Sequence, residues 1–324
     1  MKAILCKQYG PPEALSVENL PSPVAGPNQV VIRVRAAGVN FPDTLIIQNR
    51  YQFKPPLPFS PGGEFAGEIA SVGAQVSHLK VGQRVTAFTG WGAFAEEVAV
   101  DTGRVMPIPD DMPFDLAASF IMTYGTSFHA LKDRAALSAG ETLLVLGAAG
   151  GVGLAAVEIG KALGARVIAA ASSGAKLEVC RRHGADETIN YDTENLRERI
   201  KALTDGKGVD VVYDPVGGAY SEPALRSVAW RGRFLVVGFA SGTIPSIPLN
   251  LALLKGLSIN GVFWGEFIKR EPAHNAADLA ELLRLLKTGS LKPLISERYR
   301  FEQVADALNS VIGRKAVGKI VLIP

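Results

Sequence analysis

Four glycines are crowded into one short stretch, at positions 147, 150, 151 and 153. The apolar run 143–146 before them is typical of a buried parallel strand, and residues 154–163 continue with apolar side chains near helical spacing. Residues 166–171 then form a second strand-like run. A turn without side chains lets a pyrophosphate approach the backbone and the N-terminus of the following helix. The spacing departs from G-x-G-x-x-G, but its strand–turn–helix–strand context predicts dinucleotide binding.

The end of the second predicted strand should select the dinucleotide. An NAD site typically has an Asp or Glu there, which holds the ribose 2′-hydroxyl. This chain has Ser172, Ser173 and Lys176 instead, and no acid. Two hydroxyls and an ammonium suit a 2′-phosphate, so we expect NADPH. The two serines could equally cap the next helix, with Lys176 as a solvated charge, and the two interpretations are compatible.

Composition excludes several classes of protein. The 324 residues are 48% hydrophobic and 20% charged, enough for two domains with large cores. The 34 basic and 31 acidic residues give a net charge of +3, without a basic run, which argues against nucleic-acid binding. Cys6 and Cys180 lie too far apart in sequence to suggest a disulfide framework. With no signal-peptide pattern and no apolar stretch of membrane-spanning length, we expect a soluble, cytoplasmic protein without a membrane partner.

Two different patterns of apolar residues divide the chain into two regions. Up to about residue 120, short alternating runs separated by Gly and Pro predict a β-rich, partly open barrel. From residue 140, strands alternate with helices, which predicts a doubly wound parallel sheet. Residues 114–137, 275–288 and 301–311 are predicted to be helical. The last apolar run, 319–323, has no place in the parallel sheet, so we expect it to return to the first domain.

This organisation resembles the medium-chain dehydrogenase/reductase superfamily, and the match is best to its zinc-free quinone oxidoreductase branch, which is zeta-crystallin-like. The resemblance covers essentially the whole chain. It is carried by the segments 37–43, 61–67, 81–85, 148–153 and 318–322. It implies an α/β protein with a GroES-like β-rich catalytic domain, residues 1–121 with 265–324, and an NADPH-binding Rossmann domain, residues 122–264. It also implies a homodimer that pairs edge strands near residues 257–263.

Departures from the zinc-dependent alcohol dehydrogenases concern their metal ligands. Asn40 stands where those enzymes have a catalytic Cys, and their Gly-His-Glu reads Gly62-Gly63-Glu64. The four-cysteine structural zinc lobe is missing, and two separated Cys with four scattered His cannot supply one. The histidines are His78, His129, His183 and His274. We therefore expect no metal, and hydride delivery to an already electrophilic acceptor instead of alcohol oxidation.

The resemblance places three candidate catalytic residues in the first domain. Asn40 would bond the nicotinamide ribose or the substrate oxygen, although a turn Asn can simply bond its own backbone. Asp43 would hold the local network or relay a proton, or else cap a helix. Tyr51 would donate to an acceptor carbonyl, or else be a packed aromatic. Arg50 and Phe53 are weaker candidates for the mouth of the site.

The remaining candidates would contact the cofactor. Thr123 and Thr126 are expected to begin a helix below the nicotinamide, or to cap it. Tyr191 is expected near the adenine or the 2′-phosphate, Gly238 and Phe239 near the nicotinamide amide, and Phe263 and Trp264 at the acceptor wall, because ligands sit at the carboxyl ends of parallel strands. Lys319 would reach the cofactor, unless it is solvated. The full predicted cofactor set is Asn40, Thr123, Thr126, Gly147, Ala149, Gly150, Gly151, Val152, Gly153, Ser172, Ser173, Lys176, Tyr191, Gly238, Phe239, Phe263, Trp264 and Lys319.

The sequence thus predicts an NADPH:quinone oxidoreductase that needs no metal and acts on a small quinone or enone. An enoyl-thioester or alkenal/one reductase with the same fold is the alternative enzyme, and Arg50 and Lys54 are candidate contacts for a CoA ester. A non-catalytic, crystallin-like NADPH-binding protein is the alternative of another class. His129 and His183, on predicted helices, are expected to be packing or surface residues.

Overall fold

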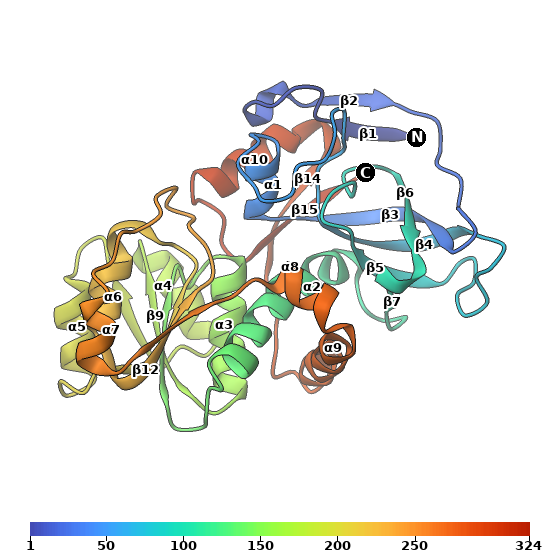
Figure 1. Cartoon of the computed structure of the whole chain (residues 1–324). Helices are drawn as coiled ribbons and strands as arrows, with labels where there is room; N and C mark the ends of the chain where they lie inside the picture. Colours follow the sequence, from blue (N-terminus) through green and yellow to red (C-terminus); the bar gives the residue numbers. More distant parts are fainter. The chain divides into compact units, whose positions relative to one another are not determined.

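The computed structural model describes residues 1–324 and divides into two compact units (Figure 1). Unit 1 comprises residues 1–122 and 293–324, and unit 2 comprises residues 123–292. The first boundary falls within one residue of the expected position. The second lies at 292/293 instead of 264/265, because residues 265–292 pack within unit 2. There, the Phe267 ring stacks on His129 with centroids 3.9 Å apart, and Lys132 Nζ lies 2.5 Å from Asp278 Oδ1.

Unit 1 is built on a seven-stranded mixed sheet with the order β14-β15-β3-β4-β5-β7, and β6 pairs with β3 off this path. Its strands are β3 (Gln29–Val39), β4 (Glu64–Val72), β5 (Arg84–Phe88), β6 (Glu97–Asp101), β7 (Val105–Pro107), β14 (Ile295–Arg300) and β15 (Lys319–Ile323), and a separate hairpin joins β1 (Lys2–Leu5) and β2 (Ser16–Asn19). The expectation that residues 319–323 return to the first domain is confirmed, since β15 pairs antiparallel with β3 (Figure 1).

Strand β3 shows why the sequence folds in this way. Along its middle, Ile32 and Val34 are buried while Arg33 and Arg35 are exposed, the alternation of a sheet with one covered face. From residue 36 to residue 39 every side-chain position is buried. The strand therefore runs into the interior of unit 1 and delivers the next residue, Asn40, to a buried position.

The helices of unit 1 are short and flank this sheet. They are η1 (Pro12–Ala14), α1 (Phe41–Ile46), η2 (Thr102–Arg104), η5 (Phe301–Gln303) and α10 (Val304–Ile312), and α2 (Phe114–Phe128) begins in this unit. The predicted helix 301–311 corresponds to η5 and α10. Helix α1 was not predicted, because its six residues are too few to show a helical period.

Unit 2 is a six-stranded parallel sheet with the order β10-β9-β8-β11-β12-β13. This is a doubly wound arrangement, as predicted, and its strand order reverses between β8 and β11. The strands are β8 (Thr142–Leu146), β9 (Arg166–Ala171), β10 (Glu187–Asn190), β11 (Val209–Asp214), β12 (Val228–Val236) and β13 (Ser258–Gly261).

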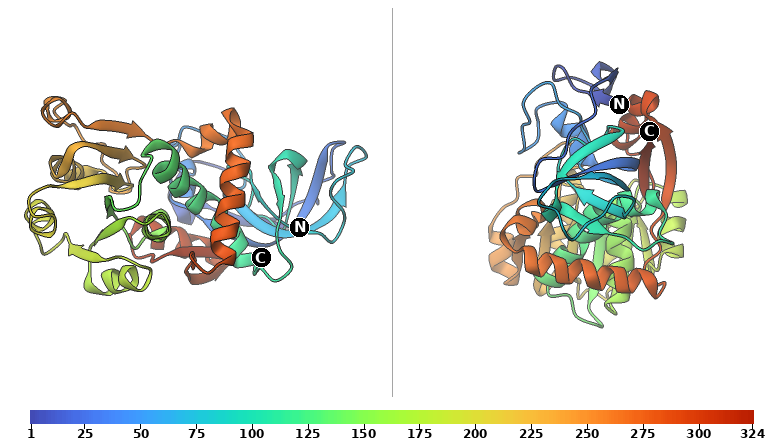
Figure 2. Two further views of the ribbon diagram at one scale, coloured as in Figure 1. Left: turned by 90° about the horizontal axis from the view of Figure 1, so that it is seen from below. Right: turned by 90° about the vertical axis from the view of Figure 1, so that its right-hand side faces the viewer.

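Except for the first, which precedes β8, the helices of unit 2 follow its strands along the chain. They are the π-helix η3 (His129–Arg134), α3 (Gly151–Ala162), α4 (Gly174–Arg182), α5 (Leu196–Leu203), η4 (Gly218–Tyr220), α6 (Ser221–Arg226), α7 (Asn250–Lys255), α8 (Trp264–Arg270) and α9 (Pro272–Lys287). Helices α3 and α4 pack on β8, β9 and β10, whereas α6 and α7 pack on β11 and β12. Figure 2 shows α9, in orange, as one straight helix. None of the helices combines the length and apolar character needed to cross a bilayer.

Candidate functional site

The glycine-rich turn lies where the strand order of unit 2 reverses, between β8 and α3. Gly147 has a φ of +57°, a left-handed conformation that favours glycine. A Cβ atom on Gly153 would lie 2.3 Å from the Gly147 carbonyl oxygen, and one on Gly147 would lie 2.7 Å from Val216 Cγ2. The turn is thus packed so closely against its own helix and the end of β11 that larger residues do not fit at these two positions.

Helix α3 begins directly behind this turn. Gly150 is its N-cap, and Gly151, Val152 and Gly153 form its first turn, where amide groups have no carbonyl partner within the helix. Its 12 residues give the N-terminus a partial positive charge that favours anions. The Ser127 hydroxyl donates to the Val152 carbonyl over 2.9 Å and so ties α2 to this turn.

The tip of β9 brings together the residues that were expected to select the dinucleotide. Lys176 Nζ donates to Ser172 Oγ over 3.1 Å, while the Lys176 backbone amide donates to Ser173 Oγ over 3.4 Å. Ser173 is therefore the N-cap of α4, and Ser172 and the Lys176 ammonium form a separate polar pair. The helix-capping interpretation is confirmed for Ser173, and the contact of Ser172 and Lys176 with a 2′-phosphate stays a prediction.

Tyr191 follows β10, and its ring packs on Tyr220 with centroids 4.3 Å apart. The Tyr220 hydroxyl donates to Asp192 over 3.0 Å. Tyr191 is therefore one member of an aromatic pair at the carboxyl edge of the sheet and not a core residue. The expected contact with adenine or with the 2′-phosphate stays a prediction.

Thr123 and Thr126 do not begin or cap a helix, so this part of the prediction is wrong. Helix α2 begins at Phe114, directly after Pro113, and the two threonines lie in its second half. Between them, a Cβ atom on Gly125 would lie 2.9 Å from the Trp264 indole. The buried Trp264 ring therefore packs on the α2 backbone beside both threonines, whereas Phe263 is 44% exposed.

Gly238 and Phe239 lie in the loop after β12, which ends at Val236. The Gly238 amide donates to the Asp214 carbonyl over 3.3 Å. The Phe239 ring packs against Gly217, where a Cβ atom would come within 2.9 Å of it. Both residues thus lie beside the end of β11, at the same sheet edge as the glycine-rich turn.

In unit 1, the Asn40 side chain takes part in a buried polar network. Lys319 Nζ donates to Asn40 Oδ1 over 2.6 Å, to Glu64 Oε1 over 3.0 Å and to the Val39 carbonyl over 3.1 Å. Asn40 Nδ2 donates to Glu64 Oε1 over 2.9 Å. An ammonium can only donate and a carboxylate only accept, so these partners fix which end of the amide faces which neighbour.

Asp43 and Tyr51 belong to the same region of unit 1. Asp43 Oδ2 accepts the Asn40 backbone amide over 2.7 Å, so Asp43 stabilises the start of α1. Burial raises the pKa of Asp43 to about 7, against the lowering effects of the Asn40 amide and Lys319. Burial, and secondarily the Asp43 charge, raises the pKa of Tyr51, whose ring packs edge-on to Phe53 at 5.6 Å.

Glu64 is the residue that sequence reasoning missed. It is fully buried, and besides Asn40 and Lys319 it accepts the Met122 amide over 3.0 Å. Three donors therefore meet on one carboxylate. Its position in the apolar stretch Glu64-Phe-Ala-Gly67 was the available signal, because a carboxylate is rarely fully buried without partners. Lys319 likewise is not solvated, since it is 4% exposed and engaged by this network.

His183 also has partners that the sequence did not reveal. Its Nδ1 lies 2.5 Å from Glu158 Oε1, and the Tyr124 hydroxyl donates to Glu158 Oε2 over 2.7 Å. Glu158 is 3% exposed. This buried cluster joins α2, α3 and the end of α4 within unit 2.

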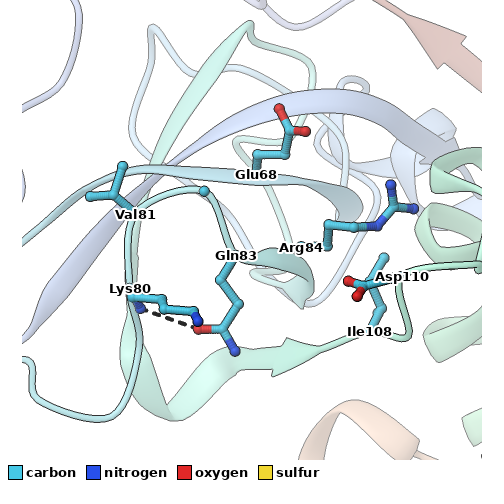
Figure 3. A pocket seen from close by; sticks show the side chains of 8 residues that line it. Glu68, Lys80, Val81, Gln83, Arg84, Ile108 and Asp110 are labelled. Carbon is cyan, nitrogen blue, oxygen red and sulfur yellow. Dashed lines mark hydrogen bonds between the residues drawn. The ribbon is translucent and has the colours of Figure 1, made fainter.

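A surface hollow of about 540 Å³ lies elsewhere on unit 1, between residues 80–84 and Asp110 (Figure 3). None of the predicted site residues lines it. The Arg84 guanidinium lies 3.9 Å from the centroid of the Phe114 ring, which gives this side chain a packing role. The candidate site residues of unit 1 are therefore not part of this hollow.

Comparisons with known proteins agree with this architecture. Residues 26–110 match the alcohol dehydrogenase GroES-like domain, and residues 151–287 match the zinc-binding dehydrogenase domain. A quinone oxidoreductase-like protein 2 homolog from Nematostella vectensis is 39% identical over 99% of this chain and 88% of its own length.

Two solved structures are similar over nearly the whole chain. Escherichia coli quinone oxidoreductase complexed with NADPH has a TM-score of 0.92 at 29% identity, covering 100% of both chains. The CurK enoyl reductase has a TM-score of 0.90 at 27% identity, covering 99% of this chain and 98% of its own. With a GroES-like unit, a doubly wound unit and these relatives, the chain belongs to the quinone oxidoreductase branch of the medium-chain dehydrogenase/reductase superfamily.

Proposed function

We propose that this protein is an NADPH-dependent reductase that reduces quinones or similarly electrophilic small molecules. The observation that carries the proposal is the occurrence of a glycine-rich turn at the start of α3 together with the Ser172–Lys176 pair at the tip of β9. Both lie at the carboxyl edge of one parallel sheet, where doubly wound proteins bind dinucleotides. The NADPH bound by the solved Escherichia coli relative supports the same cofactor here.

The residues of unit 2 fit this cofactor. The amides of Gly151, Val152 and Gly153 would hold the pyrophosphate, because the turn in front of them carries no obstructing side chain. Ser172 and Lys176 would hold the 2′-phosphate, with a hydroxyl and an ammonium already in contact. NADPH supplies the hydride.

The nicotinamide end would be held by a second group of residues, and the adenine by Tyr191. We assign the nicotinamide to the residues that the structure gathers on α2 and at the ends of β12 and β13. These are Thr123, Thr126, Gly238, Phe239, Phe263 and Trp264.

In unit 1, the orientation of the Asn40 amide limits what Asn40 can do. Its Nδ2 donates to Glu64 over 2.9 Å and to the Gly38 carbonyl over 3.5 Å, and its Oδ1 accepts from Lys319 while keeping one lone pair. We therefore assign Asn40 the role of an acceptor for a ligand hydroxyl, such as a ribose hydroxyl, and not of a donor to a substrate carbonyl. Tyr51 is the candidate donor to that carbonyl, and Asp43, with its pKa raised to about 7, is the candidate to relay a proton.

We also propose that hydride transfer needs no metal at the Asn40 position. Asn40 and Gly63 stand where zinc-dependent relatives have Cys and His ligands, and the Lys319 ammonium lies 2.6 Å from Asn40 Oδ1. This fixed positive charge opposes a second cation beside Asn40. Binding and positioning would then be the main contributions of the protein.

Two further assignments concern the molecule as a whole. We propose a homodimer through β13, because this strand ends the sheet of unit 2 and neighbouring apolar side chains are exposed. These are Trp230, Leu249, Leu253, Leu254 and Ile259. We place the protein in the cytoplasm, because Cys6 and Cys180 are free, buried thiols.

An enoyl-thioester reductase is the second candidate, favoured by the similarity to the CurK enoyl reductase. Arg50 and Lys54 are exposed, so they remain available to contact a CoA ester. A cofactor-binding protein without catalytic turnover is the third.

The deciding experiment measures NADPH oxidation with a benzoquinone, phenanthrenequinone, an alkenal and an enoyl-CoA ester, with and without a chelator. Quinone turnover that survives chelation supports the proposal. Turnover of only the alkenal or the thioester moves the protein to the second candidate, and NADPH binding without any turnover moves it to the third.

A double variant tests the assignment of Ser172 and Lys176 to the 2′-phosphate of NADPH. Ser172→Ala combined with Lys176→Ala should raise the KM for NADPH about 10- to 100-fold and leave that for NADH unchanged, because charge-assisted bonds to the 2′-phosphate are lost. Lys207→Ala, which removes an exposed lysine of the same unit, is the matched control. A wild-type preference for NADH would overturn this assignment.

A further inference from the structure

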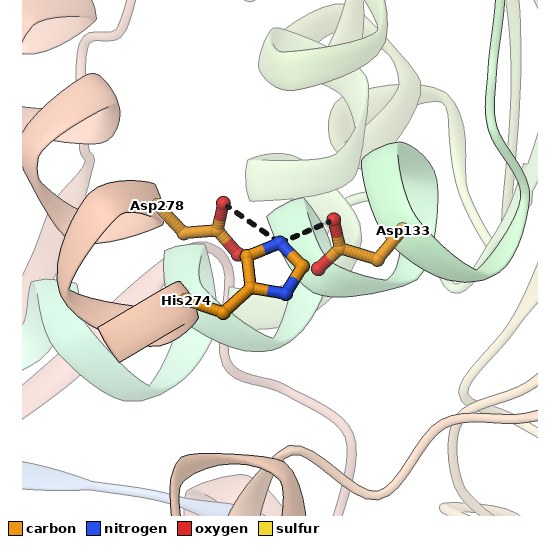
Figure 4. Close-up of side chains that lie close together, drawn as sticks. All are labelled: Asp133, His274 and Asp278. Carbon is orange, nitrogen blue, oxygen red and sulfur yellow. Dashed lines mark ion pairs between the residues drawn. The ribbon is translucent and has the colours of Figure 1, made fainter. Parts of the chain in front are cut away.

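Within unit 2, Asp133 at the end of η3 faces His274 and Asp278 on α9 (Figure 4). His274 Nε2 lies 3.3 Å from Asp133 Oδ1 and 3.9 Å from Asp278 Oδ1. One ligand atom from each of the three residues lies within 4.8 Å of the other two. The cluster is independent of the groups assigned to NADPH.

Each of these side chains also contacts a further residue. His129 Nδ1 lies 2.8 Å from Asp133 Oδ2, Lys132 Nζ lies 2.5 Å from Asp278 Oδ1, and Glu271 Oε2 lies 3.2 Å from His274 Nδ1. A carboxylate on one imidazole nitrogen fixes the tautomer that leaves the other nitrogen free to bind a cation. Asp133 Oδ1 and His274 Nε2 therefore face the centre, whereas Asp278 Oδ1, which faces His274, also accepts from Lys132.

Asp278 supplies an independent observation, a carboxylate oxygen without a hydrogen-bond partner. Its side chain is 4% exposed, and its Oδ2 atom is buried without any hydrogen-bond donor. A buried carboxylate oxygen is costly to leave unsatisfied. The three carboxylates of Asp133, Asp278 and Glu271 outnumber the one ammonium, that of Lys132, which an ion bound to Asp278 Oδ1 would have to displace.

The surroundings suit an ion site that solvent can reach. The Phe267 ring stacks on His129 at 3.9 Å and meets His274 edge-on at 5.3 Å, which orients both imidazoles. The His274 side chain is 42% exposed, so an ion can enter from solvent. Ligand atoms of a tetrahedral zinc site lie about 3.3 Å apart, and His274 Nε2 already lies 3.3 Å from Asp133 Oδ1 and 3.9 Å from Asp278 Oδ1.

We propose that Asp133, His274 and Asp278 bind a divalent transition-metal ion of the Zn²⁺ class. One imidazole and two carboxylates are ligands that this class accepts, and water would complete the coordination. The ion would join η3 to α9, two segments far apart in sequence, and so stabilise unit 2. The proposal departs from the sequence-based expectation of no metal, which considered a cysteine-rich lobe and treated the four histidines as scattered.

The test is direct zinc binding to the tag-free chain, measured by competition with a chromogenic chelator and by metal analysis after dialysis. Wild type should bind one Zn²⁺ per chain and unfold at a higher temperature with the ion than without it. Co²⁺ should give the absorption of a tetrahedral site. Absence of stoichiometric binding would overturn the proposal and leave a protonated His274 bridging two carboxylates.

The variants separate this site from adventitious binding. His274→Gln, at a partly exposed position, should fold normally and lose zinc affinity by about 100-fold, and Glu271→Gln by about tenfold. His78→Gln removes an exposed histidine of unit 1 and should change nothing. Zinc binding that survives His274→Gln, or that disappears with His78→Gln, would refute the site. Because the readout is zinc occupancy, failure here leaves the proposed reductase activity untouched.

Discussion

The glycine-rich turn of unit 2 and the Asn40 network of unit 1 are built on opposite principles. The turn uses seven consecutive residues, 147–153, and its geometry depends on backbone atoms and on missing side chains. The network uses side chains of Asn40, Glu64 and Lys319, which come from distant parts of the chain. Local sequence therefore determines the first, whereas sheet pairing determines the second. Adding an atom should damage the turn, and removing a charge should damage the network.

Lys319→Met is expected to lower the free energy of unfolding more than the other variants of these two regions. This change leaves the fully buried Glu64 carboxylate without its cation, and breaking a buried pair in this way costs about 3–5 kcal/mol. Urea denaturation measures the loss. The double variant Glu64→Gln with Lys319→Met should be destabilised less than Lys319→Met alone, because neither charge remains. If Lys319→Met is as stable as wild type, the network does not carry the stability of unit 1.

Gly153→Ala tests the turn. The new Cβ atom would lie 2.3 Å from the Gly147 carbonyl oxygen, so the backbone must shift, at a cost of about 1–3 kcal/mol. NADPH affinity, measured by fluorescence titration, should fall as well. Gly174→Ala is the matched control, since no atom lies within 4 Å of its added Cβ. Equal behaviour of the two variants would contradict the close packing inferred for the turn.

Asp43→Asn tests unit 1 through the pH dependence of its stability. A pKa raised from 3.8 to about 7 means that native Asp43 holds its proton where the unfolded chain has lost it. The contribution of Asp43 to stability is therefore fully present below pH 3.8 and is lost as the pH rises to about 7. The amide keeps an acceptor for the Asn40 backbone, so Asp43→Asn should fold and lose this pH dependence. Thermal unfolding across this range, compared with wild type, measures it, and parallel profiles would argue against a raised pKa.

The smallest changes in stability and NADPH affinity are expected from replacing the two serines at the tip of β9 one at a time. Ser173→Ala removes the N-cap of α4 and should cost about 1 kcal/mol, with little change in NADPH affinity. Ser172→Ala should instead lower NADPH affinity and leave the stability almost unchanged. Denaturation of both variants measures the stability and NADPH titration measures the affinity, and each variant should change only one of the two. Weaker NADPH binding in Ser173→Ala, with unchanged stability, would exchange the roles assigned to the two residues.

Prediction from sequence succeeded where a signal was local and repeated. The strand–turn–helix–strand unit, the parallel sheet and the return of residues 319–323 were all accessible from periodicity or resemblance. Prediction failed for features that depend on distant contacts. The apolar neighbours of Glu64 indicate its burial but not which three donors it meets, and the residues next to His274 in sequence do not indicate its contact with Asp133. Thr123 and Thr126 were expected to begin a helix, but they lie within α2, where Gly125 between them allows Trp264 to pack against the helix.

The pairing of β15 with β3 also bears on how the chain is made. On the ribosome, residues 123–292 emerge before β15, so unit 2 has all of its residues while unit 1 still lacks two strands. Until β15 is translated, Ala37, Gly38 and Val39 have no partner for one edge of β3, and such an edge invites pairing with other nascent chains. Because the chain is synthesised from its N-terminus, unit 1 stays incomplete after unit 2 has been translated. Lys319 is translated as part of β15, the strand that completes the sheet of unit 1.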